Sequence, residues 1–300
     1  MTAADLAGIA VLSLAWAGSY LLFRLLVQEV PALSIAASRV LAGAGLLHLI
    51  LAMRGRVIAR PAAGWHSYLL MGFLNNALPF VLIIHAARQL GAGMLAVMLA
   101  ATPLFTAVLA HLFAITPLDR GRVVGVLLGF VGVAVLVGPA ALVGEDLGAY
   151  LEVLAAAASY AVAGLYGRCF ADLPAIDAAA GQLSGAGIVL LPLVVVIDRP
   201  WGLPPLPAAA WLELATLAIV CTGLPFILFF ALLARVGASN VLLVTFLSPV
   251  SALLLGRLFL GEPIAGQALA GMALISCGLL AIDGRVARRL AGQGRRKNTC

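Results

Sequence analysis

The chain has 300 residues, of which 64% are hydrophobic and only 10% are charged, and its mean hydropathy is +1.14. No soluble core needs so much apolar surface, so the composition excludes a soluble globular protein. The formal net charge is +6. Four scattered cysteines show neither CxxC nor metal-ligand spacing, which argues against a disulfide framework, a zinc site and redox chemistry.

Long apolar runs determine the expected fold class. A bilayer core about 30 Å thick needs roughly 20 apolar residues in a helix. The runs are continuous rather than alternating, which favours helices over barrel strands. The sequence predicts an all-α polytopic membrane protein with ten transmembrane helices, at residues 4–27, 33–52, 66–88, 92–114, 122–138, 149–170, 177–197, 211–234, 239–260 and 266–283. The first run carries Asp5 and no Lys or Arg before Arg24, so we do not expect a cleaved signal.

Basic residues are distributed unevenly between the two sides of the predicted bundle. If both termini lie inside, thirteen Lys and Arg residues fall on the inner side and three, Arg24, Arg88 and Arg199, on the outer side. The positive-inside rule therefore predicts that both termini are cytoplasmic. The basic tail, residues 285–300, has no interleaved aromatic residues, so binding to anionic lipid headgroups is favoured over binding to nucleic acid.

The chain contains an internal repeat. LPFVLIIHAARQLGAG begins at Leu78, and LPFILFFALLARVGAS begins 146 positions later at Leu224. The same shift keeps Trp, Pro and Gly in register over roughly seventy residues, and with a shorter offset the GSY at Gly18 faces the ASY at Ala158. We expect two five-helix repeats, at residues 1–140 and 146–284. Because five is odd, the second repeat is inverted, an arrangement typical of transporters.

Several motifs carry a family resemblance: WAGSY, SRVLAGAG, ATPLFTAVLAHLF and LSPVSALLLGRLFLGEPIAGQALAGMALISCGLLAI. With them, essentially the whole chain resembles the EamA-type repeat of the drug/metabolite transporter superfamily. The first half reads ITPLD, with Thr116 where the repeat usually has glutamate. The resemblance implies ten helices, cytoplasmic termini and passage of small metabolites. Within the superfamily the chain is similar to bacterial exporters of aromatic and other neutral amino acids, which implies the bacterial cytoplasmic membrane.

Four prolines lie near the middle of predicted helices: Pro79, Pro103, Pro225 and Pro249. A proline inside a helix removes a hydrogen bond and bends the chain, which lipid tolerates only where neighbours or a watery cavity satisfy the freed carbonyl. Four matched bends at one depth predict hinges or the lining of a midplane cavity. The alternative is that they are packing kinks inherited from a duplicated ancestor.

Polar and aromatic residues share that depth and form the predicted substrate site: Trp16, Tyr20, Asn75, Asn76, Phe80, Thr102, Tyr160, Thr222, Thr245 and Ser248. Rings would hold an apolar side chain, and amides and hydroxyls would meet an ammonium and a carboxylate. The sequence thus predicts a site for an amphiphilic zwitterion. For each Asn or Thr, the alternative role is an interhelical hydrogen bond worth about 1 kcal/mol.

Charged residues narrow the expected mechanism. No carboxylate is apparent at the midplane, which argues against exchange of cationic drugs for protons. We therefore expect facilitated export, with proton-coupled efflux as the alternative. Arg39, inside the span 33–52, could meet a substrate carboxylate, but the sequence favours snorkelling or capping of helix carbonyls. His85 could titrate in an exit path or could simply be hydrated near the interface.

Two further patterns concern packing and chemistry. Small residues at Gly121, Gly125 and Gly129, and again at Gly271, Ser276 and Gly278, predict helices that pack closely within a monomer, with a dimer interface as the alternative. The chain lacks HExxH, GxSxG and GxxxxGK[ST], so we expect no enzyme, cofactor or ATP hydrolysis. The main rivals to a carrier are a membrane-embedded enzyme and a channel. The expected partners are a small-molecule substrate and membrane lipid.

Overall fold

The computed structural model describes residues 1–143, 146–241 and 243–283, so the basic tail predicted to bind headgroups lies outside the described residues. Every regular element of this part of the chain is a helix. The elements are α1 (Ala3–Leu26), α2 (Ala32–Met53), α3 (His66–Gly72), η1 (Phe73–Ala77), α4 (Leu78–Ala86), α5 (Ala92–Leu99), α6 (Thr102–Leu112), α7 (Arg120–Val143), α8 (Leu147–Tyr166), η2 (Gly167–Phe170), α9 (Ala175–Leu193), η3 (Val194–Asp198), η4 (Pro200–Gly202), α10 (Ala208–Ala218), η5 (Ile219–Gly223), α11 (Leu224–Val236), α12 (Ala238–Val241), α13 (Leu243–Leu260) and α14 (Gly266–Asp283).

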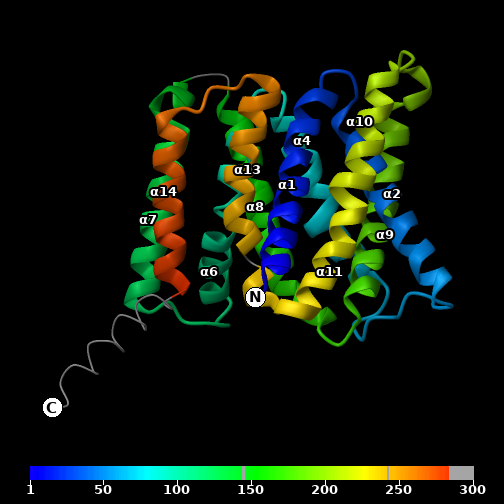
Figure 1. Ribbon diagram of the computed structural model, residues 1–300, viewed down its shortest axis with the longest axis horizontal. Coiled ribbons are helices and arrows are strands. Elements are labelled where there is room, and N and C mark those ends of the chain that lie inside the picture. Colours follow the sequence, from blue (N-terminus) through cyan, green and yellow to red (C-terminus); the bar gives the residue numbers. More distant parts are fainter. Residues whose placement is uncertain (144–145, 242, 284–300) are drawn as a thin grey trace.

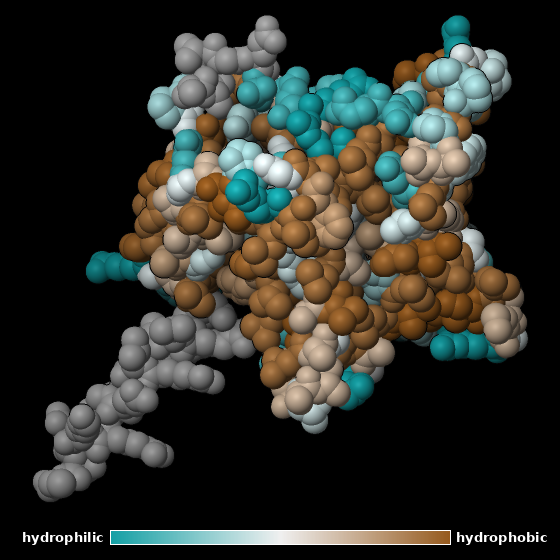
Figure 2. Space-filling model, turned by 45° about the horizontal axis from the view of Figure 1, so that its top comes forward, coloured by the Kyte–Doolittle hydropathy of each residue, from teal (hydrophilic) through white to brown (hydrophobic). Residues whose placement is uncertain are grey.

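These elements combine into long apolar spans that stand side by side (Figure 1). In the described residues, nine spans are long and apolar enough to cross a membrane, and α14 supplies a shorter apolar helix. Figure 2 shows hydrophobic residues around the sides of the bundle and hydrophilic residues gathered at one end. The predicted all-α fold is confirmed, and the expected spans differ from the observed ones by only a few residues at most ends.

The two halves of the chain run in opposite directions. The N-terminus lies at one end of the bundle, which we call the N-terminal end, and α1 runs from there to the far end (Figure 1). Successive spans alternate, so α8, which opens the second half, starts at the far end. The second half is therefore inverted relative to the first, as the odd number of helices in each repeat requires.

Close glycine packing joins α7 to α14 at one edge of the molecule (Figure 1). A Cβ atom added at Gly278 would lie 2.5 Å from the carbonyl oxygen of Gly125, and one added at Gly132 would lie 2.9 Å from that of Gly271. Only glycine allows this approach of two helix backbones. The predicted close packing within the chain is thus observed at Gly125, Gly271 and Gly278, whereas a Cβ atom added at Gly121 would meet the Asp119 side chain and not α14.

A π-helical turn precedes the matched prolines Pro79 and Pro225. The Leu78 N–H donates to Phe73 O, and the Leu224 N–H donates to Ile219 O, so both ladders shift to the wider π register. Proline has no N–H to donate, which leaves a carbonyl without its helical partner. In the first half, the Ser159 hydroxyl donates to Leu74 O at 2.7 Å. A side chain of α8 therefore satisfies this part of the bend.

The second pair of prolines behaves differently in the two halves. Before Pro103 the helix is interrupted, since α5 ends at Leu99 and α6 begins only at Thr102. Pro249 instead lies inside α13, which continues from Leu243 to Leu260. The same sequence position therefore forms a break in one half and a continuous helix in the other.

Candidate functional site

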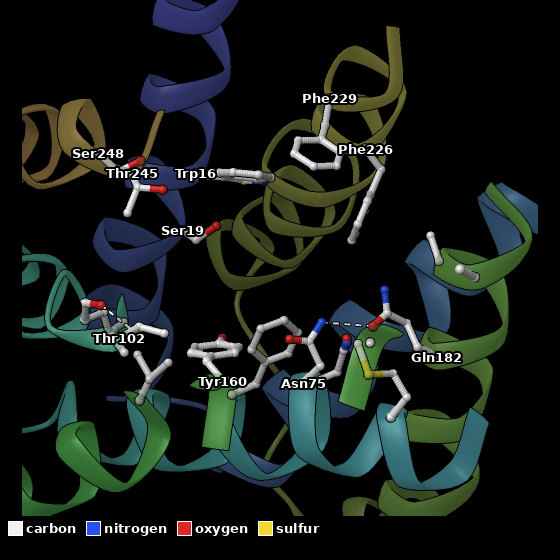
Figure 3. A pocket seen from close by; sticks show the side chains of 18 of the residues that line it. Trp16, Ser19, Asn75, Thr102, Tyr160, Gln182, Phe226, Phe229, Thr245 and Ser248 are labelled. Carbon is white, nitrogen blue, oxygen red and sulfur yellow. Dashed lines mark hydrogen bonds between the residues drawn. The ribbon is translucent and has the colours of Figure 1, made fainter. Parts of the chain in front are cut away.

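A cavity of about 830 Å³ lies between the two halves (Figure 3). Its size falls within the range of small-molecule sites, roughly 300–1,000 Å³. Both halves contribute side chains: Trp16 on α1 and Asn75 on η1 face Tyr160 on α8, Phe226 on α11 and other residues of the second half. A cavity shared by inverted halves is where a carrier holds its substrate.

Most of the predicted site residues lie around this cavity. Those that line it are Trp16, Tyr20, Arg39, Asn75, Asn76, Phe80, Thr102, Pro103, Tyr160, Thr245, Ser248 and Pro249. They come from six of the predicted spans, so the fold brings together residues that are far apart in the sequence. Contact with a substrate is still a prediction for each of them.

Four of the predicted residues lie elsewhere. Thr222 is buried and is not part of the lining; its hydroxyl accepts from Arg39 Nε and donates to Leu217 O, each at 2.9 Å. Pro79 and Pro225 are also outside the lining; each is the second residue of a helix that follows a π turn. His85 lies near the far end, where its Nδ1 atom is 2.9 Å from a carboxylate oxygen of Glu152. It is therefore paired rather than merely hydrated.

The structure adds lining residues that the sequence analysis missed, among them Ser19, Phe23, Met71, Gln182, Phe226 and Phe229. The repeat carried a signal for one of them, because Phe226 is the counterpart of Phe80 at the 146-residue shift. Helical spacing carried another, because Trp16, Ser19 and Phe23 recur at intervals of three and four and therefore share one face of α1. Trp16 and Phe229 are in ring contact, with centroids 5.7 Å apart.

Arg39 is the cation of the cavity, and its side chain is only 8% exposed. Its Nε atom donates to Thr222 Oγ1 at 2.9 Å, and its Cζ atom lies 4.3 Å from the Phe80 ring centroid and 5.2 Å from that of Phe23. Among the described residues, neither a helix carbonyl nor a carboxylate pairs with the guanidinium. The favoured prediction, snorkelling or carbonyl capping, is therefore wrong.

The polar groups of the lining fall into two sets. Some are satisfied: Asn75 Nδ2 donates to Gln182 Oε1 at 2.9 Å (Figure 3), and Thr102 Oγ1 donates to Leu99 O at 2.7 Å. Others are buried without a nitrogen or oxygen partner in the described part of the chain, namely Ser19 Oγ and Asn76 Oδ1. Leaving such a buried polar atom without a hydrogen bond costs about 1–3 kcal/mol.

The cavity extends to the N-terminal end of the bundle. Ala171 and Ala175, exposed residues between and at the ends of helices, belong to its lining, as does Leu233 near the end of α11. At the far end, polar contacts join the two halves instead. Ala92 N donates to Glu262 Oε1 at 3.1 Å, and Ser34 Oγ donates to Asp198 Oδ2 at 2.6 Å.

Inverted helical halves around a shared central cavity define the architecture of a membrane transporter. The EamA-like transporter family matches the chain twice, at residues 5–138 and 147–282. The chain belongs to this family of the drug/metabolite transporter superfamily.

Two curated relatives carry transporter names, and a third is named only as a protein. The "Uncharacterized inner membrane transporter YedA" of Escherichia coli (strain K12) is 28% identical over 243 residues, which cover 80% of this chain and 78% of that protein. The "Uncharacterized transporter YoaV" of Bacillus subtilis (strain 168) is 23% identical over 262 residues, 83% of this chain and 86% of that protein. "Protein PecM" of Dickeya dadantii (strain 3937) is 29% identical over 211 residues, 66% of this chain and 67% of that protein.

One solved crystal structure shows the same fold. It superimposes with a TM-score of 0.65 and covers 97% of this chain and 99% of its own, at 20% sequence identity. The resemblance at this identity concerns the fold alone.

Proposed function

We propose that this membrane transporter exports small amphiphilic metabolites, with neutral and aromatic amino acids as the main class, across the bacterial cytoplasmic membrane. The observation that carries the proposal is the cavity wall, in which aromatic rings such as Trp16, Phe80 and Tyr160 alternate with the amides Asn76 and Gln182. Rings bury an apolar side chain, and amides and hydroxyls hydrogen-bond the polar groups. Such a wall suits a molecule with one apolar and one polar end.

The proposed mechanism is alternating access without a coupled proton. Two inverted halves can exchange which end of a shared cavity is open. Among the described residues that line the cavity there is no Asp or Glu. A proton-coupled carrier would be expected to place an acid there, so the wall supports facilitated transport down the substrate gradient. In this proposal the N-terminal end faces the cytoplasm, in line with the positive-inside rule.

Efflux from proteoliposomes tests the proposal. Vesicles containing the purified protein are preloaded with labelled phenylalanine, methionine, threonine or lysine, and efflux is followed with and without an imposed pH gradient. We expect the neutral amino acids to leave chemically unchanged and independently of the gradient, and lysine to be retained. Efflux that requires the gradient would contradict the facilitated mechanism, and conversion of the label would contradict a carrier.

The variants Trp16→Ala and Asn76→Ala test whether the cavity is the transport site. Both residues line the cavity, so both variants should lose at least about tenfold in efflux rate, the effect of about 1.4 kcal/mol in binding. Their elution on size exclusion and their expression should match the wild type. Full activity in both would remove the cavity from the proposal.

A further inference from the structure

We infer that Arg39 recognises the carboxylate of the substrate, and that the amino group is dispensable. The cavity would then accept apolar monocarboxylates that lack an amine as well as amino acids. The inference deepens the proposed function and rests on it for the identity of the site. It starts from the charges of the cavity lining, which in the part of the chain that the structure describes includes the cation Arg39 but no Asp or Glu.

The guanidinium of Arg39 is buried, and no residue that the structure describes supplies a counter-ion for it. Its side chain is 8% exposed, and in the described residues the Nε bond to Thr222 is its hydrogen bond to the protein. Removing a charge from water is costly unless the charge is paired. A guanidinium presents N–H donors in a planar fork that matches both oxygens of a carboxylate. A ligand carboxylate would therefore supply the interaction that the protein does not.

The neighbours of Arg39 leave its Nη edge for that ligand. Phe80 and Phe23 lie against the guanidinium, with centroid distances of 4.3 and 5.2 Å, and Thr222 engages Nε. This contact set fixes the orientation of the group before a ligand arrives, which lowers the entropy cost of binding. No described protein acceptor engages the two Nη groups, whose N–H donors suit a bidentate partner.

An ammonium group would find weaker partners in the same cavity. The acceptors that the described lining offers, such as the Asn76 amide and the Ser19 hydroxyl, are neutral. A hydrogen bond between a charged and a neutral group contributes less than a desolvated ion pair with bidentate geometry. The carboxylate should therefore dominate recognition, and removal of the amine should cost little.

The anchor exists in only one half of the protein. Alignment of the GAG motifs at Gly43 and Gly185 pairs Arg39 with Gly181. A Cβ atom at Gly181 would collide with the Tyr68 ring, so no large side chain fits there. One anchor predicts one carboxylate bound in one orientation. A substrate with a second carboxylate would leave that group without a cationic partner in the wall.

Ligand-dependent thermal stability of the purified protein tests the inference without requiring transport. The probes are phenylalanine, 3-phenylpropanoate without the amine, and phenylalaninamide and phenethylamine without the carboxylate. We expect 3-phenylpropanoate to raise the melting temperature of the wild type at concentrations within about tenfold of those needed for phenylalanine. Phenethylamine and phenylalaninamide should need concentrations higher by at least about tenfold.

Arg39→Gln should abolish the preference for carboxylates over amides, and Arg39→Lys should retain part of it because it keeps the charge without the fork. The matched control is Arg257→Gln, which removes an exposed arginine of α13 outside the cavity. A merely structural role of Arg39 would lower binding of all four probes by the same factor. If Arg39→Gln does not fold, the inference is tested by the ratio of carboxylate to amide binding in Arg39→Lys and by the four probes on the wild type.

Two outcomes would overturn the inference. One is a wild type that phenethylamine stabilises as well as 3-phenylpropanoate does, and the other is an Arg39→Gln variant with an unchanged ratio. Either result leaves amino-acid export intact if efflux is observed. Conversely, stabilisation by 3-phenylpropanoate in a protein that moves no amino acid would contradict the proposed function and support the carboxylate site.

Discussion

The two halves of the chain share a sequence pattern but differ in their contacts at three matched positions. Both bend at a π turn before Pro79 or Pro225. Yet Arg39 is matched by Gly181, Ser159 donates to a backbone carbonyl whereas its counterpart Ser19 has no nitrogen or oxygen partner in the described residues, and Glu262 is matched by Thr116. The bends belong to the shared scaffold. The differences concern what faces the cavity and which end of it is closed.

The two ends of the cavity differ at the matched pair Glu262 and Thr116. At the far end α13 packs against α5, and the Glu262 carboxylate accepts a hydrogen bond from Ala92 at the start of α5. In the first half α6, which the inverted repeat relates to α13, packs against α8 and α7 at the N-terminal end. The cavity opens at that end. In the proposed alternating-access cycle, this arrangement corresponds to the state with the far end closed.

The largest expected effect is a difference in accessibility between the two ends. Ser248 lines the cavity. With Cys169, Cys277 and Cys300 replaced by serine, Ser248→Cys should react with a membrane-impermeant maleimide about tenfold faster from the N-terminal side than from the far side. This ratio corresponds to a population difference of about 1.4 kcal/mol. Thr102→Cys, its counterpart at the 146-residue shift, should show the same preference. Equal rates from both sides would contradict a resting state open at one end.

The matched serines Ser159 and Ser19 should contribute differently to the free energy of unfolding. Ser159→Ala leaves Leu74 O without the 2.7 Å hydrogen bond, so we expect a loss of about 1–3 kcal/mol in the free energy of unfolding. Ser19→Ala removes a hydroxyl that has no nitrogen or oxygen partner and should leave the unfolding free energy almost unchanged. Reversible unfolding in SDS measures both variants. Equal losses in the free energy of unfolding would mean that the two serines contribute equally to stability, and would contradict the difference proposed between the two halves.

Glu262→Gln should weaken the closure of the far end. A carboxylate at a helix N-terminus contributes about 0.3–1 kcal/mol through the helix dipole. The amide retains the length but not the charge, so labelling of Ser248→Cys from the far side should rise about two- to fivefold. Glu29→Gln, at an exposed position between α1 and α2, is the control and should change nothing. An unchanged rate for Glu262→Gln would show that packing alone closes this end.

Local patterns in the sequence predicted much of the fold but less of the site. Hydropathy predicted the ten spans, and Trp, Pro and Gly in matching positions predicted the repeat. Both signals can be read from the sequence without knowing how the helices pack. Most of the predicted site residues line the cavity because their depth in the membrane follows from span position. The sequence did not predict that Thr222 lies outside the lining or that aromatic rings surround Arg39. Both depend on how each helix is rotated about its axis, and residue spacing does not determine this rotation in helices that are apolar on all sides. In the proposed cycle, the end at which the cavity opens depends on which of the two states is populated.

The smallest effect is expected from restoring the missing acid of the first half. Thr116 occupies the position of Glu262 in the ITPLD segment, after α6. In the proposed cycle, closure of the N-terminal end would bring residue 116 towards the start of α12, as residue 262 meets α5 at the far end. Thr116→Glu should then stabilise the closed N-terminal end by about 0.3–1 kcal/mol. Labelling of Ser248→Cys from that side should fall by no more than about 1.5-fold, because the open state already dominates by about tenfold.

The control for this change is Thr116→Gln, which has the same length as glutamate but no charge. It should leave the labelling rate near that of the parent, because only the carboxylate interacts favourably with the positive end of a helix dipole. If glutamate and glutamine slow labelling equally, side-chain size and not charge governs the N-terminal end. The difference between the ends would then come from the break between α5 and α6 before Pro103 rather than from the absent acid.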